Sequence, residues 1–79
     1  MARTKTMKVV FTFHTTTHAI FMEQCCKKAA APGRLIPVPR QISAGCGMAW
    51  AAPAENREEL ERLIEVNQIE REGAYELLL

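Results

Sequence analysis

The sequence has no surplus of charge of one sign and no long apolar run. Ten Lys and Arg residues stand against nine Glu and no Asp, which gives a net charge of +1. A dedicated nucleic-acid binder or polybasic membrane binder needs a one-sided surplus, so the balance argues against both classes. No apolar stretch approaches the ~20 residues that span a bilayer. Residues 1–6 also lack the apolar segment and cleavage site of a secretory signal. We therefore expect a cytoplasmic protein.

Cysteine is scarce: the chain has three cysteines, which is an odd number. A secreted disulfide framework would leave one of them over, so we expect reduced thiols. No Cys-Xaa-Xaa-Cys pair is present, and a strand-to-helix turn is predicted between His14 and His18. A zinc site made of these histidines and Cys46 is the weaker alternative. There is also no Gly-rich phosphate loop and no Ser-His-Asp order. The sequence thus predicts no metal and no cofactor.

Seventy-nine residues leave room for one small domain. Residues 1–7 are polar, and we expect them to form a disordered N-terminal tail. The domain is predicted over residues 8–79.

Four stretches of that domain carry strand signals. In the first stretch Val9, Phe11 and Phe13 fall on one face at period two. The strands are predicted over residues 8–13, 34–38, 48–52 and 74–78. Pro37 cannot donate a hydrogen bond to a neighbouring strand, so the second strand is expected at an edge of the sheet.

Two stretches between the strands carry helix signals. A helix is predicted from Thr17 to Ala30, with an apolar stripe at Ala19, Met22, Cys26 and Ala29. Pro53 suits a first helical position, and it precedes a second helix whose apolar face is Leu60, Leu63 and Ile64. The resulting order β-α-β-β-α-β predicts an α+β, ferredoxin-like split sandwich. Such a fold has an antiparallel four-stranded sheet of order 4-1-3-2 with two helices on one face, which places the second strand at an edge.

This topology gathers a candidate site around Cys46. The first two strands are parallel, so the loop 39–47 and the turn 14–18 lie at the same end of the sheet. Gly45 and Gly47 flank Cys46 and leave its sulfur unshielded. A helix N-terminus stabilises a thiolate, the reactive form of cysteine. The supporting loop residues are Ser43, Gly45, Gly47 and Arg40, and the candidate thiolate stabilisers are His14, Thr15, Thr16 and Thr17.

The other features have simpler interpretations. Cys46 itself can instead be a small, inert loop residue, as free cysteines often are. Cys26 falls on the apolar stripe and is expected in the core, while Cys25 lies at the border of the stripe. A disulfide between these neighbours would be strained. Apolar side chains are predicted on the helix-free face of the sheet, and they are Val10, Ala49, Ala51 and Leu78.

Three stretches together resemble the selenium/sulfur (Se/S) carrier protein-like family of small bacterial proteins. They are residues 13–17, 34–40 and 42–49, and the resemblance runs over about residues 8–78. Its most specific part is Pro39-Arg40-Gln41-Ile42-Ser43 followed by Cys46-Gly47. The resemblance implies that Cys46 carries sulfur or selenium as a persulfide or selenopersulfide.

This role implies a stoichiometric thiol carrier rather than a turnover enzyme. It implies a donor such as a cysteine desulfurase, and an acceptor protein. The alternative is a non-catalytic module that binds a ligand or another protein, with a structural Cys46 and a possible homodimer through the helix-free sheet face.

Overall fold

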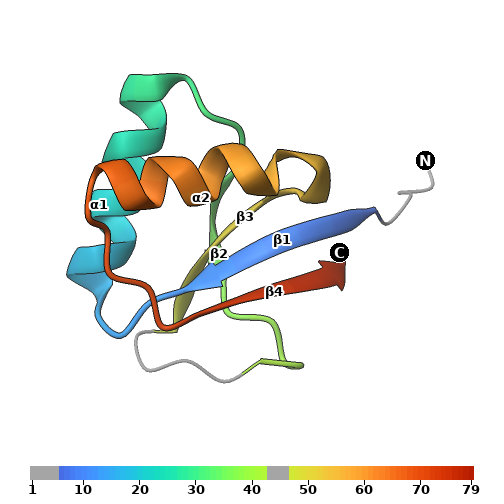
Figure 1. The fold of residues 1–79 in the computed structure, drawn as a ribbon. Coiled ribbons are helices and arrows are strands. Elements are labelled where there is room, and N and C mark those ends of the chain that lie inside the picture. Colours follow the sequence, from blue (N-terminus) through green and yellow to red (C-terminus); the bar gives the residue numbers. More distant parts are fainter. Residues whose placement is uncertain (1–5, 43–46) are drawn as a thin grey trace.

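The computed structural model describes residues 6–42 and 47–79. Its elements, shown in Figure 1, are β1 (Met7–Thr12), α1 (Thr16–Ala29), β2 (Arg34–Pro37), β3 (Met48–Pro53), a 3-10 turn (Ala54–Asn56), α2 (Arg57–Val66) and β4 (Gly73–Leu78). Their order and pairing confirm the predicted α+β, ferredoxin-like fold. Among the described residues, no helix is both long and apolar enough to cross a membrane.

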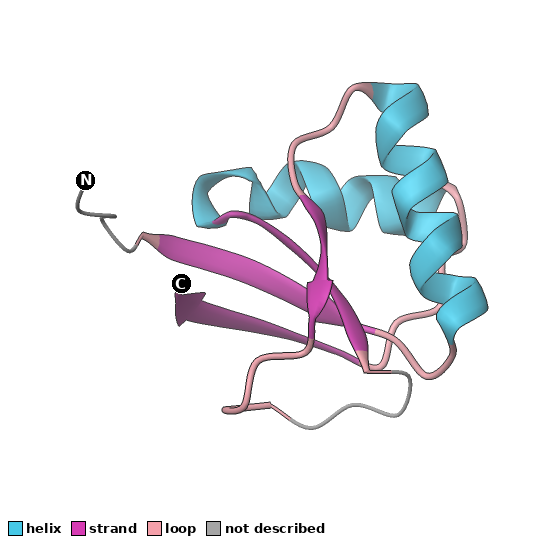
Figure 2. Ribbon diagram, turned by 180° about the vertical axis from the view of Figure 1, so that it is seen from behind, coloured by secondary structure: helices cyan, strands magenta, loops and turns pink. Residues whose placement is uncertain are grey.

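The sheet has the order β2-β3-β1-β4, and each pair of neighbours is antiparallel. Read from the β4 edge, this is the predicted order 4-1-3-2. Strand β2 lies at an edge of the sheet. At this position the missing N–H group of Pro37 does not interrupt the hydrogen bonding of an inner strand. Both helices lie on one face of the sheet (Figures 1 and 2).

The main core lies between the sheet and the helices. Val9 and Phe11 of β1 face the helices and are fully buried. They contact a cluster to which both helices contribute, including Ala19, Met22, Cys26, Leu60, Leu63 and Ile64. Burying a large apolar side chain contributes about 1.5–3 kcal/mol, so these contacts hold the two layers together.

The helix-free face of the sheet is covered in part by the chain itself. Val10, Ala49 and Ala51 lie on this face, as predicted, and all three are buried. The side chains packed on them include Val38 and Ile42, from the segment after β2, and Leu77 and Leu79 at the C-terminal end. This segment therefore folds beneath the sheet, where no helix lies.

The placement of Leu78 on that face was wrong by one residue. Lys8 pairs with Leu77, which puts Leu77 on the face of Val10, whereas Leu78 pairs with Met7. Leu78 is 57% exposed. Successive strand residues point to opposite faces, so a shift of one position moves a side chain across the sheet.

The ordered sheet begins inside the segment expected to be a tail. Strand β1 starts at Met7 rather than Lys8. Thr6 and Leu79 exchange two backbone hydrogen bonds, of 3.2 and 3.1 Å. The antiparallel pairing of β1 with β4 thus continues one step beyond both strands, while residues 1–5 lie outside the described residues.

The expected helical position of Pro53 was also wrong. Pro53 ends β3 opposite Lys8, with a φ of −56° and an extended ψ of 137°. A proline φ near −65° suits an extended residue as well as a helical one. A short 3-10 turn follows, and α2 begins only at Arg57.

The connection from α1 to β2 brings the backbone close to Trp50. Ala30 adopts a left-handed conformation and ends the helix, and the Trp50 indole N–H donates a 3.3 Å hydrogen bond to the Pro32 carbonyl. Gly33 follows with a φ of +116°. A Cβ atom at Gly33 would overlap the Trp50 ring and lie 2.6 Å from the Ala51 carbonyl oxygen.

Gly33→Ala is expected to lower the free energy of unfolding by about 2 kcal/mol or more, because neither the backbone angle nor the space admits a side chain. Gly47→Ala is the matched control. Gly47 also has a positive φ, of 76°, but a Cβ atom there meets nothing within 4 Å. Its cost should be only about 1 kcal/mol. Urea denaturation measures both, and equal losses would contradict the steric explanation.

Helix α2 is tied to the sheet by an ion-pair network. Arg57 donates hydrogen bonds to Glu61, one turn along α2, and to Glu76 of β4. Arg71 lies 3.6 Å from Glu61 and stacks over the Phe11 ring. The hydrogen bond from Arg57 holds the pKa of Glu61 below its ordinary value of 4.5.

Glu61→Gln should lower the free energy of unfolding at pH 7 by under about 1 kcal/mol, since the side chains of Glu61 and Arg57 are both more than a third exposed. A lowered carboxyl pKa stabilises the fold above the ordinary value, and this contribution is lost as the pH falls through the lowered pKa. The stabilities of the variant and the parent should therefore converge below pH 4.5. Glu58→Gln, which breaks no ion pair among residues 6–42 and 47–79, should show no such convergence.

Candidate functional site

The predicted site residues divide into two groups. Ser43, Gly45 and Cys46 lie outside the described residues. The flanking residues Arg40 and Gly47, and residues 14–17 at the start of α1, are described. The structure therefore describes the residues that precede and follow the segment 43–46 along the chain, and the start of α1.

The residues on either side of the segment 43–46 are anchored. The Gly47 carbonyl accepts a 3.0 Å hydrogen bond from the Val38 amide, which extends the β2–β3 pairing one step past Pro37 and Met48. Ile42 donates its amide to the Pro39 carbonyl at 3.0 Å and packs on the helix-free sheet face. The chain is held by a turn and apolar contact on one side, and by sheet-like pairing on the other.

The start of α1 is capped as the threonine cluster predicts. Thr15 has an extended conformation, and its hydroxyl accepts a 3.3 Å hydrogen bond from the His18 amide. The first turn of α1 contains no acidic side chain. Thr16 and Thr17 are exposed. The first amides of a helix have no partner within it, so this end keeps its partial positive charge.

His18 completes a polar cluster beside this cap. Its Nδ1 atom lies 3.1 Å from the Thr15 hydroxyl oxygen, and its Nε2 atom lies 3.6 Å from a Glu70 carboxylate oxygen. The sequence placed His18 only in the weaker zinc alternative, and the resemblance implied no role for it. The structure shows that His18 links the start of α1 to the segment before β4.

Arg40 and residues 14–17 come from the same end of the sheet but lie on different faces of it. Thr12 pairs with Ala49, so the end of β1 and the start of β3 are neighbours (Figure 1). Arg40, however, lines a groove on the helix-free face. Among the described residues, no hydrogen bond or ion pair joins Arg40 to the start of α1.

The two helical cysteines occupy different environments, as predicted. Cys26 is 1% exposed and belongs to the main core. Burial, with smaller contributions from Cys25 and Glu59, raises the pKa of the Cys26 thiol to about 11. The thiolate is the nucleophile, so Cys26 is a poor one at neutral pH.

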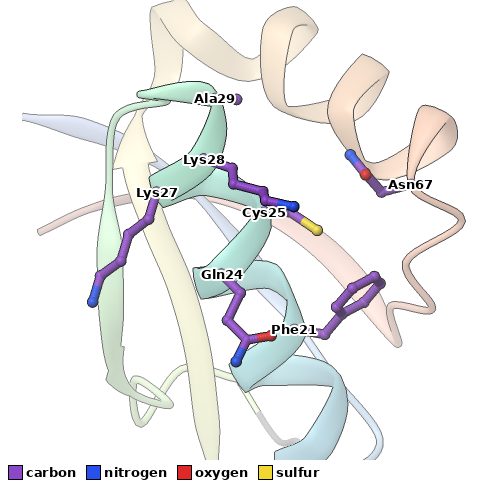
Figure 3. A pocket seen from close by; sticks show the side chains of 7 residues that line it. All are labelled: Phe21, Gln24, Cys25, Lys27, Lys28, Ala29 and Asn67. Carbon is purple, nitrogen blue, oxygen red and sulfur yellow. The ribbon is translucent and has the colours of Figure 1, made fainter.

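Cys25 is half-buried and lines an open hollow of about 840 Å³ beside α1. Figure 3 shows its sulfur pointing toward the gap between α1 and the end of α2, where the side chains of Phe21 and Asn67 also lie. Lys28 also lines this hollow. The part of the chain that the structure describes holds no group of three or more His, Cys or Glu side chains placed to bind a metal ion.

Iodoacetamide should label Cys25 faster than Cys26 in the native protein. With a pKa of about 11, only about one Cys26 in a thousand is a thiolate at pH 8, and the side chain is enclosed as well. Mass spectrometry of the proteolytic peptides measures the two rates. In the unfolded chain the rates should become similar, and native labelling of Cys26 as fast as that of Cys25 would contradict the buried placement.

The chain was then compared with known proteins. No curated protein and no solved structure matches it. The family model described as "Putative Se/S carrier protein-like" matches residues 8–76, which take in both helices and most of the sheet. The resemblance that the sequence suggested is thereby confirmed, and the chain belongs to the Se/S carrier protein-like family.

Proposed function

We propose that this protein is a stoichiometric carrier that holds sulfur or selenium on Cys46. The observation that carries the proposal is membership of a family whose description names a Se/S carrier. The burial of Cys26 adds support, because it removes one of the other two thiols as a reactive group. A free thiol carrier requires a reducing compartment, so the proposal places the protein in the cytoplasm.

The proposed loading step is a thiol–persulfide exchange. The Cys46 thiolate attacks the terminal sulfur of a donor persulfide, for example one on a cysteine desulfurase. The donor sulfur–sulfur bond breaks, the donor leaves as a thiolate, and Cys46 becomes a persulfide that keeps the proton of the terminal sulfur. No external oxidant or reductant is consumed. An acceptor protein then takes the terminal sulfur by the same exchange.

Several described features suit this chemistry. Gly47 is exposed and has a positive φ, so the residue next to Cys46 adds no side chain that would hinder a partner. The start of α1 carries a partial positive charge with no carboxylate in its first turn. In the proposal His14, Thr15, Thr16 and Thr17 belong to this stabilising end, and Arg40 and Ser43 support the loop.

Cys46→Ser should abolish the transfer of labelled sulfur from a loaded cysteine desulfurase, because the accepting nucleophile is gone. Cys25→Ser is the matched control and should accept label as the parent does. Mass spectrometry detects the gain of one sulfur atom, and circular dichroism checks that each variant folds. Retention of label in Cys46→Ser, or its equal loss in Cys25→Ser, would sink the proposal. Repeating the assay with a selenium donor distinguishes the two cargoes.

The second candidate function is a non-catalytic binding module in which Cys46 is structural. The groove beside Arg40 on the helix-free face favours it. In that case Cys46→Ser lowers stability and leaves binding intact. A homodimer through this face is less favoured than the sequence suggested, because Val10, Ala49 and Ala51 are already covered by their own chain.

A further inference from the structure

A groove of about 1020 Å³ runs across the helix-free side of the sheet. Strand β2, the segment after it and the end of β3 form its walls, and Ile36, Val38 and Ala51 provide its apolar part. Ile36 and Val38 are half-buried and pack on the small cluster of this face. The groove is distinct from the hollow beside Cys25, which lies along α1.

Three cationic side chains of the described residues line this groove, which we call the basic groove. They are Lys8, Arg34 and Arg40. None of the nine glutamates lines it. Within residues 6–42 and 47–79 these three cations form no ion pair, whereas Arg57 and Arg71 are both paired with Glu61. The overall charge is close to neutral, but every charged side chain that the described residues contribute to the groove is positive.

The strand register explains how two of these cations come together. Arg34 pairs with Ala51, and Lys8 pairs with Pro53. Both side chains therefore project on the same face, on either side of β3. Arg40 joins them because the segment after β2 folds beneath the sheet.

The form of the groove favours an extended chain over a small molecule. Small-molecule sites enclose most of their ligand, whereas this groove is open to solvent. Strand β2, which borders it, is a sheet edge, and edge strands accept an added strand through their outward backbone groups. Pro37 lacks an N–H group, so such pairing is restricted to the residues before it.

We propose that the basic groove binds an acidic, partly apolar segment of a partner protein. Carboxylates of the segment contact the three cations, and its apolar side chains rest on Ile36, Val38 and Ala51. Complementary charge gives such a contact its specificity and its rate of association. The identity of the partner as a donor or acceptor of sulfur rests on the proposed function. The binding itself does not.

The test uses a fluorescein-labelled peptide in which Glu and Leu alternate, with binding followed by fluorescence polarisation. The parent protein should bind it with an affinity that falls as salt rises. Lys8→Glu combined with Arg34→Glu should weaken binding about tenfold or more, because attraction becomes repulsion. The matched control, Lys27→Glu with Lys28→Glu, makes the same charge change on α1 and should bind as the parent does. Circular dichroism confirms that both variants fold.

Several outcomes would overturn the inference. These are an absence of saturable binding, equal loss in both double variants, or equal binding of a peptide with Lys in place of Glu. Binding of octanoate at the groove without binding of the peptide would assign the site to a small carboxylate instead. A parent dimer that Lys8→Glu with Arg34→Glu dissociates, with no peptide binding, would assign it to a second copy of the chain.

Loading of Cys46 by polysulfide, read by mass spectrometry, separates this inference from the proposed function. Peptide binding by a protein that takes up no sulfur would overturn the carrier function and leave the groove assignment standing. Sulfur uptake without peptide binding would overturn the groove assignment and leave the carrier function standing.

Discussion

Strand β1 lies between β3 and β4, and its residues from Val9 to Thr12 are buried on both faces of the sheet. Val9 and Phe11 are covered by the two helices, but Val10 points to the side that has no helix. Burial of Val10 therefore requires another part of the chain to cover it, and the segment with Val38 and Ile42 does so. The same packing forms the basic groove and anchors the residue before the segment 43–46. The need to cover both faces of one central strand thus positions the surfaces to which we assign function.

The three thiols differ because of where the backbone carries them. Cys25 and Cys26 are neighbours on one helix, where successive side chains point about 100° apart. Cys26 consequently enters the core while Cys25 reaches a hollow at the surface. A carrier needs a thiol that can ionise and that a partner can reach, and burial denies both to Cys26. This leaves Cys46 and Cys25 as the two candidate carrier thiols, and the sulfur-transfer assay distinguishes them.

The near-neutral net charge conceals an uneven distribution. Several cations of the helical side are paired with glutamates, as in the network of Arg57, Arg71 and Glu61. Among the described residues, the lining of the basic groove contains three cations and no glutamate. Total charge argues against a general polyanion binder, yet it carries no information about a local surface that selects one acidic segment. Such a surface is needed wherever a carrier recognises only some of the proteins it meets.

The order of the elements, the edge position of β2 and the family could all be predicted from the sequence, because periodicity, proline chemistry and loop motifs are local properties. The same locality explains the errors at Pro53, whose φ suits strand and helix alike, and at Leu78, whose face depends on pairing with β1. The role of Cys46 was predicted from its motif and stays a prediction. The packing of Ile42 on the helix-free face and the meeting of three cations at the basic groove could not be predicted in this way. These contacts join segments distant in the chain, and which segments meet depends on the register of the sheet and on the burial of β1.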